Sequence, residues 1–178
     1  MPYSLADATL PVLKAALATL SNIIKKLEAH ATANSIPLTD LPNWKLADDM
    51  LPLSFQVFMV CDAASKFVSR ASGEEPASFN RDTLTSLEAC HTLIADAQKI
   101  VDKAEAATIE KNTDVDVTIN LGPEKTATMP SRGYAEGYTL PNVFFHLNMA
   151  YAIGRSKGVQ LGKMDYLTPF IGKWIGMA

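Results

Sequence analysis

The 178-residue sequence lacks the features of a membrane, secreted or zinc-finger protein. Polar residues interrupt every apolar run well before the ~20 residues that a transmembrane helix needs. The N-terminal residues lack the basic head, apolar middle and small-residue cleavage site of a secretory signal. The two cysteines, Cys61 and Cys90, lack zinc-site spacing and have apolar neighbours, which predicts buried free thiols. We therefore expect a cytoplasmic protein that does not cross a membrane.

Charge and catalytic motifs are equally sparse. The 16 Lys and Arg residues against 19 Asp and Glu give a net charge of -3, which argues against nucleic-acid binding. No expected helix has the basic face of a helix-turn-helix DNA reader. A Gly-rich phosphate loop, a Gly-x-Ser-x-Gly elbow and a His-x-x-x-His pair are absent. The composition, 48% hydrophobic and 20% charged, predicts an ordinary globular chain with one domain over residues 1–178.

Four segments have the apolar spacing of amphipathic helices, with apolar residues three or four positions apart. Pro11 fits only the opening turn of the first helix. Asp48 or Asp49 is expected to cap the second helix, and Asp82 or Thr83 the third. The expected helices cover residues 9–33, about 48–73, about 82–106 and 140–155.

Between the third and fourth helices the apolar period changes to two. Apolar and polar residues alternate over 115–121, and Gly122 and Pro123 supply a turn before residues 126–129, which predicts a small β-hairpin. A Gly- and Tyr-containing loop is expected next, and residues 158–178 are expected to form an irregular tail. The predicted fold is all-α: an up-down-up-down four-helix bundle with a small β-hairpin between helices 3 and 4.

His146 is the most informative single residue. Only His146 and Asn148 break the apolar run between Val143 and Ile153, and at ~100° per residue they lie on opposite sides of a helix. A helix that is buried all round must hide at least one of them, and a hidden imidazole needs a partner. Such a residue can be a metal ligand, a proton shuttle or a hydrogen-bonded core histidine, and the last is the commonest.

Other candidate residues lie on the second and third helices. Asp49 and Gln56 are two helical turns apart, so they share one face and can line a pocket. Asp49 also has a structural explanation as a helix cap, worth ~1 kcal/mol, and Gln56 can simply reach solvent. His91 lies on the apolar face of the third helix. The single Glu-x-x-His match, Glu88 to His91, lacks the second copy that a di-metal carboxylate bundle requires.

Three segments are similar to a known family: LPNVFFHL at 140–147 with its continuation to 167, LADDMLPLSFQV at 46–57, and LEAHA at 27–31. They resemble an uncharacterised domain-of-unknown-function family of the DinB/YfiT-like four-helix-bundle superfamily. The resemblance covers nearly the whole chain, and it implies the bundle fold without a settled activity.

Members of this superfamily often bind a divalent metal through one histidine on helix 2 and two histidines, four residues apart, on helix 4. The resemblance places Asp49 or Gln56 near the first position, His146 at the second and Ala150 at the third. Because only one imidazole remains, it implies no resident cofactor. A weakly held divalent cation near Asp49 and His146 is the remaining metal option.

Two hypotheses of function follow. The first is a small-molecule-binding protein or metal-independent acid–base enzyme, of the isomerase, cyclase or transferase type, with an apolar pocket among the helices. His146 and Asp49 would be its acid–base pair, acting on a small organic substrate. The further residues expected to contact the substrate or gate the pocket are Gln56, Tyr151, His91, Lys163 and Asp165. The alternative is a non-catalytic protein whose buried polar residues form a structural network. A homodimer is expected, with neither nucleic acid nor membrane as a partner.

Overall fold

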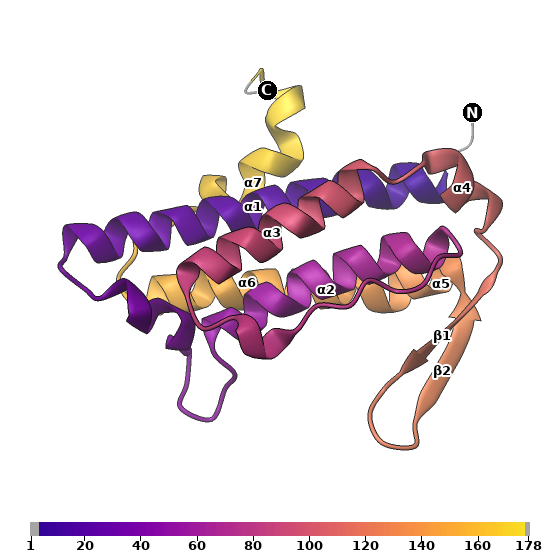
Figure 1. The fold of residues 1–178 in the computed structure, drawn as a ribbon. Coiled ribbons are helices and arrows are strands. Elements are labelled where there is room, and N and C mark those ends of the chain that lie inside the picture. The colour runs from indigo at the N-terminus through magenta and orange to yellow at the C-terminus, as the bar shows by residue number, and fades with distance from the viewer. Residues whose placement is uncertain (1–3, 177–178) are drawn as a thin grey trace.

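Four long helices form a bundle in the computed structural model, which describes residues 4–176 (Figure 1). α1 and α2 each pack against α3 and α6, so α1 and α2 lie diagonally opposite each other. The expected all-α bundle with a β-hairpin between its third and fourth helices is confirmed. The bounds of the bundle helices are α1 Leu5–Ala33, α2 Leu53–Ala71, α3 Leu87–Asp102 and α6 Leu140–Ser156.

The helix directions differ from the alternating order that we expected. Lys14 near the start of α1 pairs with Asp102 at the end of α3 at 3.1 Å, and Glu28 near the end of α1 contacts His91 near the start of α3 at 3.0 Å. α1 and α3 are therefore antiparallel, and the order is up-down-down-up. The 15 residues 72–86 allow this order because an extended chain spans about 3.3 Å per residue, enough to return along the 19-residue α2 (Figure 1).

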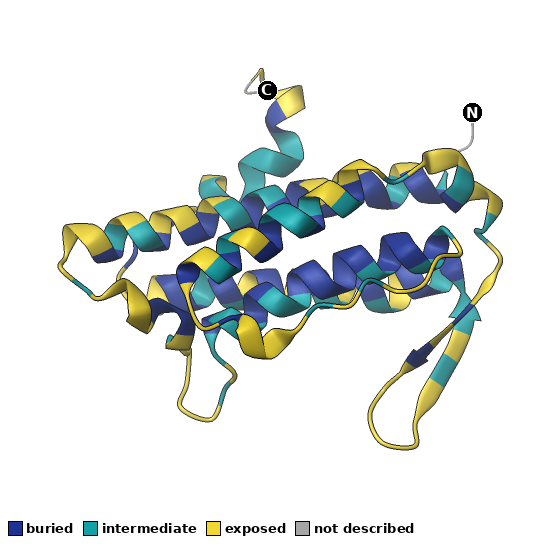
Figure 2. Cartoon of the chain, in the orientation of Figure 1, coloured by how far each residue is buried: buried dark blue, intermediate teal, exposed yellow. Residues whose placement is uncertain are grey.

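The core lies along the facing surfaces of the four helices, and exposed residues cover the outside (Figure 2). The apolar spacing of α1 predicts its inner face correctly, since Leu13, Leu17 and Ile24 are fully buried. Burying each such side chain stabilises the fold by about 1.5–3 kcal/mol. Cys61 and Cys90 are buried free thiols, as expected, and burial raises the pKa of Cys90 to about 11. Among residues 4–176, no helix is long and apolar enough to cross a membrane.

Side-chain caps set helix starts that the apolar pattern misplaced. α1 begins at Leu5 rather than residue 9, because the Ser4 hydroxyl accepts the Asp7 N–H while the Asp7 carboxylate accepts the Ser4 N–H. Pro11 consequently lies in the second turn of α1 and not in the first. Pro11 removes one backbone hydrogen bond from this turn, and α1 continues through it.

α2 starts later than expected, at Leu53 with Pro52 as its N-cap. A proline disfavours helical geometry in the residue before it, which keeps Leu51 out of the helix, and residues 44–50 form bends and turns ahead of it. Asp49 is therefore not a cap of α2: it lies on an exposed turn ahead of the helix. At the other end the helix stops as predicted, because Gly73 adopts a φ of +76° there.

The connections contain short helices that the sequence pattern did not predict. α3 is capped by the Ser86 hydroxyl, so the expected start at Asp82 or Thr83 is wrong. These two residues belong to a separate short turn, and α3 ends before residue 106. The short elements are η1 Leu38–Asn43, η2 Arg81–Thr83 and α4 Ala106–Lys111.

The hairpin consists of β1 (Asp116–Asn120) and β2 (Thr126–Pro130). The strands are antiparallel, with Val117 opposite Met129 and Ile119 opposite Ala127. Val117 and Ile119 are buried while their neighbours in β1 are exposed, as the period of two predicts. The hairpin lies beside the end of α2 (Figure 1).

Two segments expected to be irregular are helical. α5 (Ser131–Tyr134) and a π-helical turn, η3 (Ala135–Thr139), lead directly into α6, so the expected Gly- and Tyr-containing loop is wrong. The expected irregular tail contains α7 (Lys163–Ile171), which packs on α1, and η4 (Gly172–Trp174). Asp165 explains the start of α7, because its carboxylate accepts the Gly162 N–H at 2.7 Å.

Candidate functional site

His146 and Gln56 are brought together between α6 and α2. His146 Nδ1 lies 2.8 Å from Gln56 Oε1, and Gln56 Nε2 donates to the Leu51 carbonyl oxygen at 3.0 Å. Because the amide oxygen can only accept, Nδ1 carries the hydrogen and Nε2 is the unprotonated nitrogen. Both side chains are buried, His146 with 9% of its surface exposed and Gln56 with 3%. The expectation that the fourth helix hides an imidazole is confirmed.

The surroundings of His146 disfavour its charged form. Burial lowers the pKa of His146 to about 4, so the ring is neutral at neutral pH. Phe55 and Phe145 meet the imidazole edge to face, with ring centroids 5.8 and 5.1 Å away. α6 is not buried all round as expected, since Phe145 is 56% exposed and Asn148 faces outward.

The structure does not join Asp49 to His146. Among the described residues 4–176, no hydrogen bond or ion pair connects the two side chains, and the partner of His146 is the neutral Gln56 amide. An amide fixes the tautomer of the ring but does not raise its proton affinity as a carboxylate does. The acid–base arrangement that motivated the first hypothesis is therefore replaced by a neutral hydrogen bond.

Of the other expected site residues, Lys163 and Asp165 lie on α7, and Tyr151 of α6 contacts the segment just before it. The Tyr151 hydroxyl donates to the Leu161 carbonyl oxygen at 3.1 Å, and Lys163 is exposed in the first turn of α7. Asp165 pairs with Lys26 of α1 at 2.6 Å. The pKa of Asp165 is lowered, first by the Gly162 N–H and then by Lys26. Tyr151 and Asp165 thus hold the chain around α7 in place.

His91 lines a different part of the surface. It contacts Glu28 beside a hollow of about 460 Å³ between α1, η1 and α3, and a second hollow of about 410 Å³ continues along α3. Both hollows are open to solvent. Their acidic residues are Glu28, Glu88 and Asp96, and His91 is the one histidine that lines them. His146 lines neither of these hollows.

A smaller and more enclosed cavity of about 170 Å³ lies between α2, the hairpin and the segment leading into α6. We call it the α2–α6 pocket. Two rows of side chains with helical spacing face each other across it, one from α2 and one from α5, η3 and α6, while β1 covers a third side. The lining residues are Met59, Asp62, Ala63, Lys66, Arg70, Ile119, Asn120, Tyr134, Tyr138 and Asn142.

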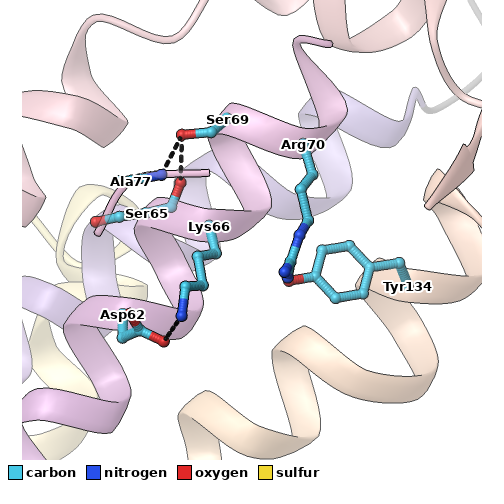
Figure 3. A network of polar contacts seen from close by, with 7 residues as sticks. All are labelled: Asp62, Ser65, Lys66, Ser69, Arg70, Ala77 and Tyr134. Carbon is cyan, nitrogen blue, oxygen red and sulfur yellow. Dashed lines mark hydrogen bonds and ion pairs between the residues drawn. The ribbon is translucent and has the colours of Figure 1, made fainter. Parts of the chain in front are cut away.

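The charged groups of the pocket all come from α2 (Figure 3). Lys66 Nζ pairs with Asp62 Oδ2 at 2.8 Å. Arg70 Nη1 donates to the Tyr134 hydroxyl oxygen at 2.6 Å, from the other wall of the pocket. Within the described part of the chain Arg70 makes no ion pair with Asp or Glu, so the pocket holds one cation without a counter-charge.

Tyr134 anchors the opposite wall. Its ring is stacked between Phe67 and Tyr138, at centroid distances of 6.2 and 5.7 Å. Burial raises the pKa of the Tyr134 hydroxyl, and the adjacent Arg70 guanidinium opposes that rise. The π-helical turn η3 follows directly, and such turns often occur at functional sites because they re-aim side chains.

Comparison with known proteins gives the family and agrees with the fold. The family model of a domain of unknown function, DUF1993, matches residues 5–167. The chain belongs to the DUF1993 family. The crystal structure of a DinB family member protein from Shewanella denitrificans is similar, with 30% sequence identity, a TM-score of 0.82, and coverage of 92% of this chain and 91% of that chain. A search of curated proteins gives no match. The resemblance to an uncharacterised DinB-like family is confirmed.

The side chains of this DUF1993 chain do not fit the three-histidine metal pattern implied by the superfamily. Gln56 rather than Asp49 faces His146, and its amide oxygen is already bound to the ring N–H. Ala150 is fully buried and offers no donor atom. Across residues 4–176 no group of three or more His, Cys, Asp or Glu side chains is placed to hold a metal ion. The residues at this position therefore do not fit that metal centre.

Sequence reasoning missed the α2–α6 pocket of this DUF1993 chain, although one signal for it was present. Asp62, Lys66 and Arg70 recur at every fourth position of α2, so they form a single charged row on a helix whose other residues carry no charge. The second row could not be found, because Tyr134 and Tyr138 belong to a segment that was expected to be a loop.

Proposed function

We propose that the protein binds a small organic acid in the α2–α6 pocket, with the ligand carboxylate held by Arg70. The uncompensated charge of Arg70 is the observation that carries this proposal. A planar guanidinium presents several N–H groups in a geometry that matches a carboxylate, and here one of them contacts a neutral phenol. The remaining donors are available for a ligand.

The charge balance of the pocket supports an anionic ligand. Lys66 and Asp62 neutralise each other, which leaves the positive charge of Arg70. Arg70 is half-buried and lies at a concave site, where less water screens its charge. Its electric field is therefore stronger there than on an open surface. Asn120 and Asn142 add side-chain amides, which can orient a ligand by hydrogen bonds.

The size of the pocket supports a small ligand. Sites for drug-sized molecules have volumes of ~300–1,000 Å³. The α2–α6 pocket has about 170 Å³, so its ligand is a short acid rather than a nucleotide or a lipid. The apolar side chains of Met59 and Ile119 complete the lining and suit a short hydrocarbon chain.

For His146 we infer the structural role of the second hypothesis. Its ring N–H, the Gln56 amide and the Leu51 carbonyl form a chain of hydrogen bonds that is buried between α2 and α6. A satisfied buried network specifies packing without requiring chemistry. This role is supported by the neutral partner and the aromatic neighbours of the ring.

NMR titration tests the proposed function. Purified protein labelled with ¹⁵N is titrated with a panel of short carboxylic acids of about three to six carbons, plain and hydroxylated, chosen to fit the small volume. We expect saturable shifts centred on the amides around Arg70 and Tyr134. The Arg70→Gln variant should bind at least about tenfold more weakly, because charge-assisted hydrogen bonds contribute ~1.5–3 kcal/mol.

Arg81→Gln is the matched control, since Arg81 is an exposed arginine on η2 outside the pocket. It should leave acid binding unchanged. The proposal is wrong if no acid in the panel binds. It is also wrong if Arg70→Gln, like the control Arg81→Gln, binds acids as tightly as the unaltered protein. Circular dichroism of both variants separates lost binding from lost fold.

A further inference from the structure

We infer that the ligand of the α2–α6 pocket is a hydroxy acid, whose hydroxyl donates to Asp62 while its carboxylate meets Arg70. This inference rests on the proposed function, and it adds the second recognition group. At the opposite end of the charged row from Arg70, one buried polar atom has no partner within the part of the chain that the structure describes.

Asp62 is the most buried of the charged side chains in the pocket. Its side chain is only 10% exposed, and Oδ2 is bound to Lys66 Nζ at 2.8 Å. The other oxygen, Oδ1, is buried and has no hydrogen-bond donor among residues 4–176. Buried acceptors are nearly always satisfied in folded proteins, since an unpaired one loses its hydration without compensation. Because Asp62 lines the pocket, its unpaired carboxylate oxygen indicates a donor that the ligand brings.

The two ends of the row differ in what they can bind. Asp62 and Arg70 are eight residues apart on α2, which separates their Cα atoms by ~12 Å along the helix axis. A ligand carboxylate is repelled by Asp62 and attracted by Arg70, so an acid is oriented with its anionic end towards Arg70. Its far end then lies towards Asp62, where a hydrogen-bond donor is required.

Lys66 decides between a hydroxyl and an ammonium as that donor. It already neutralises Asp62, so a ligand ammonium would add a second cation beside Lys66 Nζ. Two neighbouring ammonium groups repel each other, so the charged form of both the ligand ammonium and Lys66 would be disfavoured. A hydroxyl donates one hydrogen bond and adds no charge. The terminal torsion of an aspartate is soft, so a small rotation of the Asp62 carboxylate presents Oδ1 to the hydroxyl.

The decisive measurement is a ratio of affinities within matched ligand series. Straight-chain acids of about three to six carbons are compared with their terminal hydroxy and terminal amino derivatives by the same NMR titration. We expect the best hydroxy acid to bind about tenfold or more tightly than its plain counterpart, because its hydrogen bond is made to a charged group. The amino derivative should bind no better than the plain acid.

The double variant Asp62→Leu/Lys66→Met removes the ion pair without stranding a charge. In this variant the hydroxyl preference should fall to about onefold, whatever happens to overall affinity, because both ligands lose Lys66 equally. Asp62→Asn is the second variant, in case the double variant fails to fold; its neutral oxygen should reduce the preference several-fold. Asp96→Leu/Lys99→Met removes a comparable pair from α3, at 2.9 Å, and should preserve the preference.

The outcomes separate this inference from the proposed function. If plain and hydroxy acids bind equally and Arg70→Gln weakens both, the pocket binds acids but Asp62 Oδ1 is satisfied by solvent, and the hydroxy-acid inference is overturned. If amino acids bind most tightly, the ligand donor is an ammonium, which also overturns it. If no acid binds, the proposed function itself fails.

Discussion

The hydrogen bond between His146 and Gln56 leads to a quantitative prediction about acid stability. In the folded protein the pKa of His146 is lowered to about 4, against 6.5 for an unperturbed histidine. Between these values the unfolded chain binds a proton that the folded chain excludes. Acid therefore favours unfolding, and stability is lost as the pH falls from about 6.5 to about 4.

The size of the effect follows from the shift. One pKa unit corresponds to about 1.36 kcal/mol, so the lowered pKa of His146 removes about 3 kcal/mol of unfolding free energy between pH 7 and pH 4. Folded domains of this size have a stability of only ~5–15 kcal/mol. The acid sensitivity that His146 alone confers is therefore a large part of the total.

The His146→Gln variant isolates this contribution. Glutamine can still donate an N–H towards Gln56 Oε1, but it does not titrate. Urea unfolding at pH 7, 6, 5 and 4 gives the stability difference between the two proteins. Carboxylates are common to both proteins and cancel. We expect the unaltered protein to be more stable than His146→Gln at pH 7. The difference in unfolding free energy should then shift by about 3 kcal/mol in favour of the variant between pH 7 and pH 4.

A His30→Gln variant controls for the loss of an imidazole as such, because His30 is only half-buried and lies outside the core, near the end of α1. The reasoning is refuted if the stability curves of the unaltered protein and His146→Gln remain parallel from pH 7 to pH 4. Parallel curves would mean that the imidazole exchanges protons as freely in the fold as in water.

Three further substitutions test the contacts that set the fold. Ser4→Ala should lower the unfolding free energy by about 1 kcal/mol in urea unfolding, because the capping hydroxyl bound by Asp7 is lost. Gly154→Leu should lower it by about 1–3 kcal/mol, since a Cβ at Gly154 already meets Leu27 Cδ1 at 2.8 Å; an unchanged midpoint would contradict this packing. Asp165→Asn should lower the melting temperature at neutral pH, and the difference should shrink as acid protonates the native carboxyl, because the lowered pKa of Asp165 reports stabilisation of the charged form.

The sequence predicts the bundle helices well because their apolar periods are long and regular. The failures cluster where a single side chain decides the geometry. The start of α1 depends on the Ser4 cap and the start of α2 on Pro52, and neither lies within the apolar pattern. α7 depends on the Asp165 cap and on packing against α1. Short helices gain little from periodicity, since tertiary contacts supply most of their stability.

The predicted direction of α3 differs from the observed one for another reason. Short connections force neighbouring helices to be antiparallel, and we applied that rule to residues 72–86 although they are long enough to return along the bundle. Apolar periodicity carries no information about direction. The ion pairs that reveal it, such as Lys14 with Asp102, join residues far apart in the sequence.

The candidate site was predictable only in part. The burial of His146 follows from its place in an apolar helix, whereas its partner depended on where α2 begins. With the start at Leu53, Gln56 lies in the first turn and reaches both His146 and the Leu51 carbonyl, while Asp49 remains outside the helix. A shift of four or five residues in one helix start thus exchanged a carboxylate for an amide and removed the expected acid–base pair.

The buried histidine and the α2–α6 pocket are linked through the register of two helices. Gln56 with His146 and Arg70 with Tyr134 are two bridges between α2 and the segment that ends in α6, and on α2 they lie ~21 Å apart. Since both bridges join the same pair of elements, the buried one fixes the relative position of the pocket walls. The imidazole of His146 can therefore affect ligand affinity without touching the ligand. In the His146→Gln variant, ligand affinity should change only if the substitution shifts α2 relative to α6.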